Sequence, residues 1–170
     1  MRFFSGFGFQ NEEDFFDEFL VNNDFSIAGF SYGAIKAFET AYNSSFRVDL
    51  LQLFSPAFFQ DKNSAFKKLQ IMSFKKNNNK YMDNFYNNAI YPSTKLIKKY
   101  KKSSNIEDLK ELLYYVWDKT KLKVLVKKGI KIEVYLGEYD KITDTKRVLE
   151  FFRDFATIYF LNKKGHTLWI

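Results

Sequence analysis

Residues 26–35 read Ser-Ile-Ala-Gly-Phe-Ser-Tyr-Gly-Ala-Ile, and this stretch decides the fold. The apolar run 25–28 predicts a buried strand, and the run 34–42 predicts a helix directly after it. Between them lies a G-x-S-x-G turn centred on Ser31. A strand, this turn and a helix, in that order, are typical of a nucleophile elbow, which holds a serine in a sharp, strained turn. The alternative is an ordinary strand-to-helix turn that contains an incidental serine.

The rest of the chain alternates strands and helices around this unit. Further strands are predicted at 2–4, 48–54, 130–136 and 157–161, and further helices at 11–20, at 106–128 and from 143 onward. Asn105 is placed to cap the helix at 106–128, which can also be interpreted as two abutting helices. Nearly all-apolar strands that alternate with helices indicate a parallel sheet covered on both faces.

Residues 57–129 interrupt this alternation. They are rich in lysine and asparagine and show helical but not strand patterns. We therefore expect a core formed by 1–56 and 130–170, and a helical cap or lid insertion with a return helix at 57–129. Aromatic residues are interleaved with the lysines, and each is interpreted either as core packing or as the wall of a channel: Phe58, Phe59, Phe66, Phe74, Tyr81, Phe85, Tyr86, Tyr91 and Tyr100.

The composition limits the chemistry. The 170 residues suffice for one domain with a real core. The absence of cysteine excludes disulfides and a thiol nucleophile, and it fits a reducing cytoplasm. With His166 as the sole histidine, a zinc site of the usual type is excluded, and we expect no metal. No apolar run approaches the ~18 residues of a membrane span, and the first residues are too short an apolar stretch for a signal peptide.

The positive charge is concentrated in one segment. Residues 61–102 contain eleven lysines, no arginine and two acids, a net charge of +9, whereas the whole chain carries +7. This segment is interpreted either as a solvated face or as a docking patch for an acidic partner. Nucleic-acid binding is a weaker interpretation, because arginine is absent from the patch.

Six of the seven glycines fall in loops that follow predicted strands. The carboxyl ends of parallel strands meet at one edge of the sheet, where ligands bind. The same loops carry Ser31, then Asp140, then His166, in the order Ser…Asp…His of a hydrolytic triad. Glu138 and Asp144 are alternatives to Asp140, although Asp144 is interpreted as a helix cap. A lone histidine can also be a packed core residue.

The chemistry of such a triad assigns the roles. Ser31 would attack an acyl carbonyl, His166 would accept and return the proton, and Asp140 would orient the imidazole. The backbone amides of Phe7 and Tyr32 would form the oxyanion hole. The loop that contains Phe7, Ser5-Gly6-Phe7-Gly8, can also be interpreted as an ordinary tight turn.

These motifs resemble those of the α/β-hydrolase superfamily. More narrowly, they resemble the short pimeloyl-[acyl-carrier protein] methyl ester esterases of biotin synthesis, of the Helicobacter and Campylobacter type. The resemblance rests on residues 3–9, 29–33, 137–140 and 165–167. Many hydrolases have His-Gly where this chain has Ser5-Gly6, which leaves the backbone donor in place. The resemblance implies a minimal α/β-hydrolase fold of about five mostly parallel strands, because the usual strands ahead of the oxyanion loop are missing.

The resemblance also implies a reaction, namely hydrolysis of pimeloyl-carrier methyl ester to pimeloyl-carrier and methanol, without a cofactor. The partner would be an acyl carrier protein that bears an acyl-phosphopantetheine substrate; nucleic acid and membrane are not expected. We expect a cytoplasmic monomer. A thioesterase, a general short-chain carboxylesterase and a non-catalytic carrier-binding module remain alternatives. Candidate docking residues are Lys67, Lys68, Lys75, Lys76, Lys98, Lys99, Lys101 and Lys102.

Overall fold

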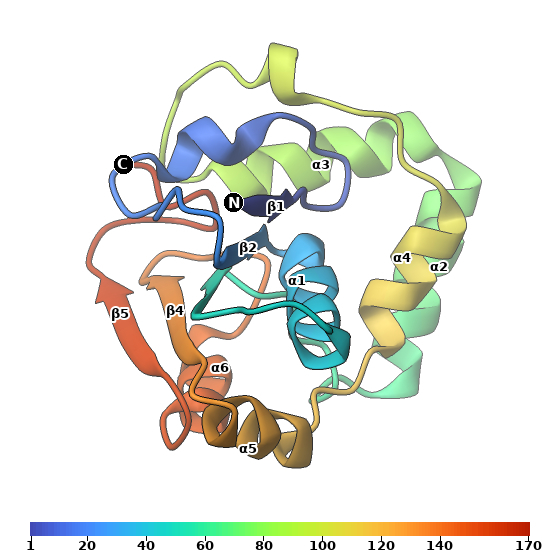
Figure 1. Ribbon diagram of the computed structural model, residues 1–170. Helices are drawn as coiled ribbons and strands as arrows, with labels where there is room; N and C mark the ends of the chain where they lie inside the picture. Colours follow the sequence, from blue (N-terminus) through green and yellow to red (C-terminus); the bar gives the residue numbers. More distant parts are fainter.

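Five strands form one sheet in the computed structural model, which describes residues 1–170 (Figure 1). They are β1 (Arg2–Phe4), β2 (Ser26–Phe30), β3 (Leu50–Phe54), β4 (Lys131–Gly137) and β5 (Thr157–Leu161). All neighbouring strands are parallel, and the strands lie side by side in chain order. The predicted minimal parallel sheet is confirmed, and each predicted strand end is right to within two residues.

Six α-helices and two short 3-10 helices complete the fold. They are η1 (Glu12–Phe16), α1 (Tyr32–Asn43), α2 (Ser64–Lys76), α3 (Asn78–Ile90), η2 (Lys98–Tyr100), α4 (Ile106–Tyr114), α5 (Lys119–Lys127) and α6 (Thr145–Phe152). The predicted helix at 106–128 is therefore two helices. Asn105 caps the first by accepting the N–H of Asp108 at 2.7 Å, and Asp118 caps the second by accepting the N–H of Thr120.

The helix predicted at 11–20 is wrong in kind and in length. The chain forms only the five-residue η1 there, and Asn11 has a left-handed conformation with no capping hydrogen bond. The reason is the side chain of Glu12. It points inward, is fully buried, and accepts the N–H of Gly6 at 2.6 Å.

The two faces of the sheet are covered by different elements. The Cβ direction of Gly29 on β2 points at Gly33 of α1, so α1 covers the face of the sheet to which Gly29 points. Leu53 is paired with Gly29 on the neighbouring strand β3 and points to the same face. Side chains alternate along a strand, so Phe54 points to the opposite face. There the ring of Phe16 stacks on it at 4.4 Å.

The prediction that both faces are covered is wrong for β5. This strand forms one edge of the sheet and exposes Tyr159 and Phe160. After β5 the chain continues into the loop that carries His166.

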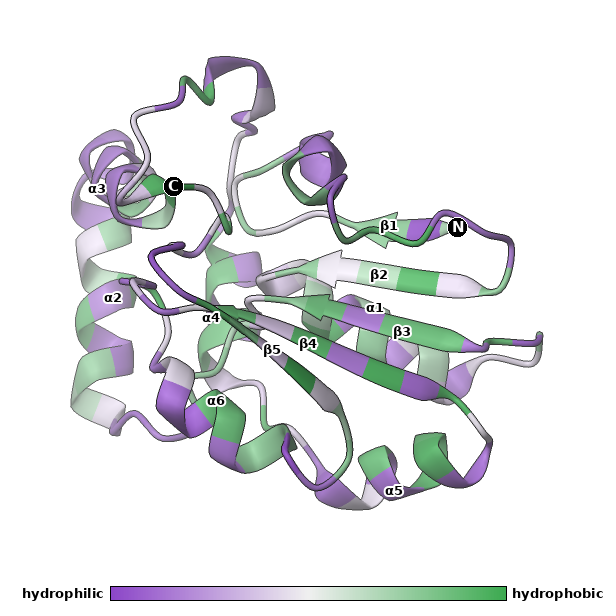
Figure 2. Cartoon of the chain, turned by 90° about the vertical axis from the view of Figure 1, so that its left-hand side faces the viewer, coloured by the Kyte–Doolittle hydropathy of each residue, from purple (hydrophilic) through white to green (hydrophobic).

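The segment between β3 and β4 contains α2, α3, η2, α4 and α5 and no strand. In Figure 2 the arrowheads of the strands point toward α2 and α3, which cover the carboxyl edge of the sheet. In contrast, α5 returns to the core and packs against α1 and β4. No helix has the length and apolar composition that are needed to cross a bilayer.

The turn after β2 brings three backbone segments into contact. A Cβ atom on Gly29 would lie 2.2 Å from the carbonyl oxygen of Gly33, and one on Gly33 would lie 1.9 Å from that of Phe4. Both distances are far inside van der Waals contact with backbone atoms, which cannot swing aside. Glycine is therefore required at both positions.

We expect Gly33→Ala to lower the free energy of unfolding by about 3 kcal/mol or more, because the new methyl group forces β1 away from α1. Gly129→Ala is the matched control. Gly129 also has a positive φ, of 79°, but a Cβ atom there meets nothing within 4 Å. Gly129→Ala should therefore lower the free energy of unfolding by about 1 kcal/mol, because only the unfavourable positive φ of alanine contributes. Urea denaturation measures both, and equal losses would contradict the close-contact argument.

Candidate active site

Ser31 occupies the strained turn between β2 and α1. Its φ of 53° and ψ of −113° form a combination that side-chain-bearing residues rarely adopt. Hydrogen bonds hold it there: the N–H of Ser31 donates to the carbonyl of Phe54 at 2.9 Å, and its carbonyl accepts the N–H groups of Ala34 and Ala57. Strain that the surroundings fix in this way is typical of a functional residue.

His166 lies beside Ser31, in the loop that follows β5. Its Nε2 is 2.9 Å from Oγ of Ser31, and the residue is fully buried. The loop is pressed against the end of α3: a Cβ on Gly165 would lie 1.6 Å from the carbonyl oxygen of Tyr91, and the N–H of Thr167 donates to Ala89. The end of α3 therefore helps to place the imidazole.

Asp140 completes a hydrogen-bonded chain. Its Oδ2 is 2.7 Å from Nδ1 of His166, and its side chain is fully buried. The carboxylate also accepts the N–H groups of Ile142 and Thr143 and the hydroxyl of Thr143. Because a carboxylate only accepts, Nδ1 carries the proton, which leaves Nε2 free to accept from Ser31.

The two neighbouring acids have other partners. Glu138 accepts the N–H of Lys163, and Asp144 caps α6 by accepting the N–H groups of Lys146 and Arg147. Of the three acids considered from the sequence, the structure brings only Asp140 to His166. The sequence interpretation of Asp144 as a helix cap is confirmed.

Two backbone amides near Ser31 have no acceptor in the chain. These are the N–H groups of Phe7 and Tyr32, neither of which takes part in a backbone or side-chain hydrogen bond of the fold. Tyr32 opens α1, where the helix dipole favours negative charge. The contact of Gly33 with Phe4 and Ser5 holds the loop of Phe7 against this helix end. Two such donors beside a serine can stabilise an oxyanion.

The side chain of Tyr32 reaches the opposite way and binds α4. Its hydroxyl donates to Glu111 at 2.6 Å, and Lys36 donates to the same carboxylate. Burial disfavours ionisation of Glu111, but the hydrogen bonds from Lys36 and Tyr32 outweigh it and lower its pKa. Burial and the neighbouring Glu111 raise the pKa of Tyr32, so the phenol remains a donor.

A cavity of about 380 Å³ opens at Ser31. Its walls come mainly from α2, α3 and α4, and its polarity changes along its length. Near the base lie the buried side chains Phe7, Phe59, Leu109, Leu112 and Leu113. Ser73, Asn84 and Asn88 are exposed, and they provide polar groups at the rim. Such a cavity can hold an apolar chain with a polar continuation.

The interleaved aromatic residues divide between packing and cavity lining. Phe59, Phe66, Tyr81 and Phe85 line the cavity. The remaining five do not, and four of these are buried in the core: Phe58, Phe74, Tyr86 and Tyr100. Both interpretations of these aromatic residues therefore hold, each for a different subset.

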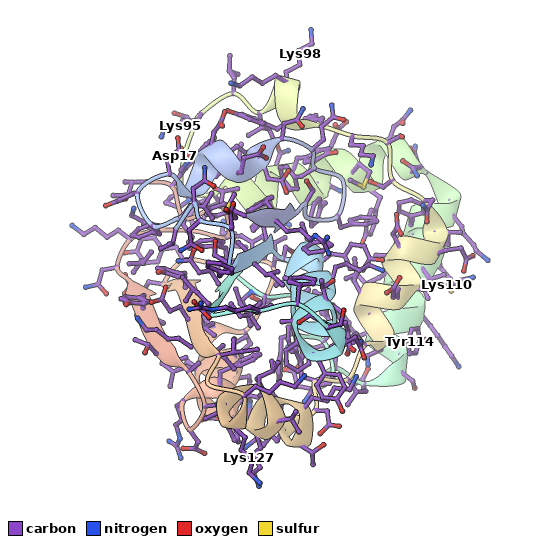
Figure 3. The ribbon with its side chains drawn as sticks, in the orientation of Figure 1. Asp17, Lys95, Lys98, Lys110, Tyr114 and Lys127 are labelled. Atoms are coloured by element: carbon purple, nitrogen blue, oxygen red, sulfur yellow. The ribbon has the colours of Figure 1, made fainter.

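The eight candidate docking lysines differ in exposure. Lys67 is buried, and its Nζ lies 5.2 Å from the ring centroid of Tyr114, so it is unsuited to docking. Lys68 lies on the exposed side of α2, and Lys98 and Lys99 lie on η2, where Lys98 points outward (Figure 3).

Four of these lysines gather where α2 ends and α3 begins. Lys75 and Lys76 close α2, while Lys101 and Lys102 share a surface pocket with Asn78 and Asn79, the first residues of α3. We call these four exposed lysines the basic corner. No group of three or more His, Cys, Asp or Glu side chains comes close enough to hold a metal ion.

Comparisons with known proteins identify the fold. No protein-family model matches the sequence, and no curated protein is detectably similar to it. Among solved structures, the esterase EaEST from Exiguobacterium antarcticum matches with a TM-score of 0.64 at 15% identity, over 82% of this chain and 58% of that one. BioG from Haemophilus influenzae matches with a TM-score of 0.59 at 12% identity, over 97% of this chain and 87% of that one. MenH from S. aureus matches with a TM-score of 0.52 at 15% identity, over 84% of this chain and 60% of that one.

These likenesses and the sheet topology define the chain as having the α/β-hydrolase fold, in a minimal five-stranded form. The predicted fold class is confirmed. The chain spans only 53–58% of the length of the first matching hydrolases, but 87% of BioG. The fold of the chain therefore agrees with the resemblance that its sequence motifs indicated.

We expect Asp140→Asn to slow labelling of Ser31 by a fluorophosphonate by about three to four orders of magnitude, because an amide can hold the imidazole in the wrong tautomer. Asp144→Asn is the matched control. It removes an acid of the same region, and asparagine caps a helix equally well. Its labelling rate should equal that of the wild type, as measured by gel fluorescence over time. Equal slowing in both variants would contradict a specific role of Asp140 in the reactivity of Ser31.

Proposed function

We propose that the protein is a serine carboxylesterase that hydrolyses the methyl ester of a pimeloyl group carried on acyl carrier protein. The observation that carries the proposal is the hydrogen-bonded chain Ser31–His166–Asp140, set beside two unpaired backbone amides at the end of an apolar cavity. The motifs around these residues resemble those of the short esterases of this specificity. Esterases are also among the proteins with the same fold.

The geometry supports a two-step acyl transfer. Oγ of Ser31 attacks the ester carbonyl while Nε2 of His166 takes its proton, and the amides of Phe7 and Tyr32 bind the oxyanion. The tetrahedral intermediate collapses as His166 gives the proton to the methoxy oxygen, which leaves as methanol. Water, deprotonated by His166, then attacks the acyl-enzyme and releases the carboxylate and Ser31. Asp140 stabilises the imidazolium in both steps.

The cavity favours a long, mainly apolar acyl group. An ester carbonyl at Ser31 places the methylene chain among Phe and Leu side chains, which bury apolar surface. Gln70, Ser73, Asn84 and Asn88 follow toward the rim, where amide and hydroxyl groups can pair with the amides of a phosphopantetheine arm. The apolar part of the wall thus suits the methylene chain of the proposed substrate, and the polar part suits its phosphopantetheine arm.

The basic corner is the proposed carrier-docking surface. Acyl carrier proteins are typically acidic, and exposed lysines attract them over distances of about a Debye length. The corner joins α2 to α3, the same two helices that line the rim of the cavity. A carrier docked there lies beside the cavity into which its prosthetic group would extend.

The direct test is to incubate the protein with monomethyl-pimeloyl-carrier and to determine the product mass, with Ser31→Ala alongside. We expect the wild type to convert the methyl ester into the free acid with the thioester intact, and the variant to lose essentially all turnover. Release of free carrier would replace the proposal with a thioesterase. Binding of the carrier without any conversion would favour a non-catalytic module.

We expect Lys75→Glu/Lys76→Glu to lower kcat/KM for the carrier-bound ester by about tenfold at low salt, and the difference to shrink as salt is added. The rate on free dimethyl pimelate should be unchanged, because that ester needs no docking. Lys127→Glu is the control, since this lysine projects from α5, at the far end of the molecule from Lys98 (Figure 3). An equal loss in the control would show that only net charge matters.

A further inference from the structure

Glu12 is a buried ionisable residue that the proposed reaction does not use. It is fully buried, although glutamate in a protein is almost always exposed or paired. Its Oε1 accepts the N–H of Gly6 at 2.6 Å, while Oε2 has no hydrogen-bond partner. Burial raises the pKa of Glu12. A buried carboxyl group with one oxygen that lacks a hydrogen-bond partner lowers the stability of the fold. Stability therefore does not explain why Glu12 occupies this position.

The hydrogen bond from Gly6 fixes the loop that carries the proposed oxyanion donor. On one side of Gly6, its N–H is held by Glu12; on the other, its carbonyl accepts the N–H of Phe9 at 3.0 Å. The C=O and N–H of a trans peptide point in opposite directions. Since the carbonyl of Gly6 points into the turn toward Phe9, the N–H of Phe7 in the same peptide points out of it.

The hydrogen bond from Phe9 acts on this peptide directly, and the chain on either side of it is held by Glu12 at the N–H of Gly6 and by Tyr86 and Lys102 at the carbonyl of Gly8. Gly6 lacks the side chain that would limit its backbone angles, and Gly8 on the other side of Phe7 has a φ of 75°. The N–H of Phe7 has no acceptor in the chain that would hold it in place. An oxyanion donor acts only within a narrow range of distance and direction, so its peptide plane must be fixed before the reaction.

We infer that Glu12 is a positioning residue that orients the Phe7 amide toward the oxyanion, by accepting the N–H of Gly6. The inference rests on the proposed hydrolytic function and extends it to a side chain that touches no substrate. To hold the N–H of Gly6, residue 12 needs one acceptor oxygen at the end of a side chain as long as that of glutamate. A neutral amide oxygen meets that requirement, whereas an apolar or a shorter side chain does not.

The experiment compares Glu12→Gln, Glu12→Met and Glu12→Asp, with Glu13→Gln as the control, because Glu13 is the next acid of η1 and does not bind Gly6. Steady-state kinetics use p-nitrophenyl butyrate, which needs no carrier. We expect Glu12→Met and Glu12→Asp to lower kcat about 10- to 100-fold with KM within twofold, since removal of an oxyanion donor altogether costs about 100- to 1,000-fold. Glu12→Gln and Glu13→Gln should stay within threefold of the wild type.

A trifluoromethyl ketone inhibitor supplies the second readout, because it adds to Ser31 and forms an oxyanion. Its inhibition constant should rise by the same factor as kcat falls in Glu12→Met and Glu12→Asp, while thermal unfolding verifies that each variant is folded. If Glu12→Met does not fold, Glu12→Gln and Glu12→Asp decide the question.

Unchanged kcat in the folded Met or Asp variant, or a loss in Glu12→Gln as large as theirs, would overturn the inference alone. A wild type that neither cleaves the ester nor is labelled by a fluorophosphonate would overturn the proposed function, and the inference with it.

Discussion

The backbone contact between the elbow and β1 is the constraint on which the rest of the structure depends. Gly33 lies against the carbonyl of Phe4, and Gly29 against that of Gly33, so strand, turn and helix meet without intervening side chains. This contact fixes Ser31 in its strained conformation and brings the loop of Phe7 beside it. The loop carrying His166 depends on a similar contact, between Gly165 and the carbonyl of Tyr91. Ser31 and His166 are thus placed by backbone packing.

The site is built from both parts of the chain. The strand ends supply Ser31, Asp140 and His166, whereas α2, α3 and α4 supply most of the cavity wall. A sheet with only five strands offers little material to enclose a substrate, and the long segment between β3 and β4 provides it. Figure 2 shows how α2 and α3 stand across the carboxyl edge of the strands. A sheet of five strands is therefore compatible with a cavity of about 380 Å³.

The strands and the loops of the site could be predicted because apolar runs and glycines are local signals. Two features could not, for the same physical reason. An acid after Asn11 matches the first turn of an exposed helix, and only the N–H of Gly6 turns Glu12 inward. Likewise, Lys67 looks like its neighbour Lys68 in the sequence, but it is buried, and its Nζ lies 5.2 Å from the ring centroid of Tyr114 on α4. Both outcomes are decided by residues outside the helix that carries the side chain: Gly6 lies before η1, and Tyr114 lies on α4.

The phenol of Tyr32 has a consequence for how such a protein can change during evolution. Tyr32, the residue that follows Ser31, is hydrogen-bonded through its side chain to Glu111 of α4, and Lys36 of α1 binds the same carboxylate. The segment between β3 and β4 is consequently not an interchangeable module. A chimera that received α4 from another protein of this fold would leave the Tyr32 hydroxyl without its acceptor. The lining of the cavity can thus change more readily through α2 and α3, which have no such bond to the elbow.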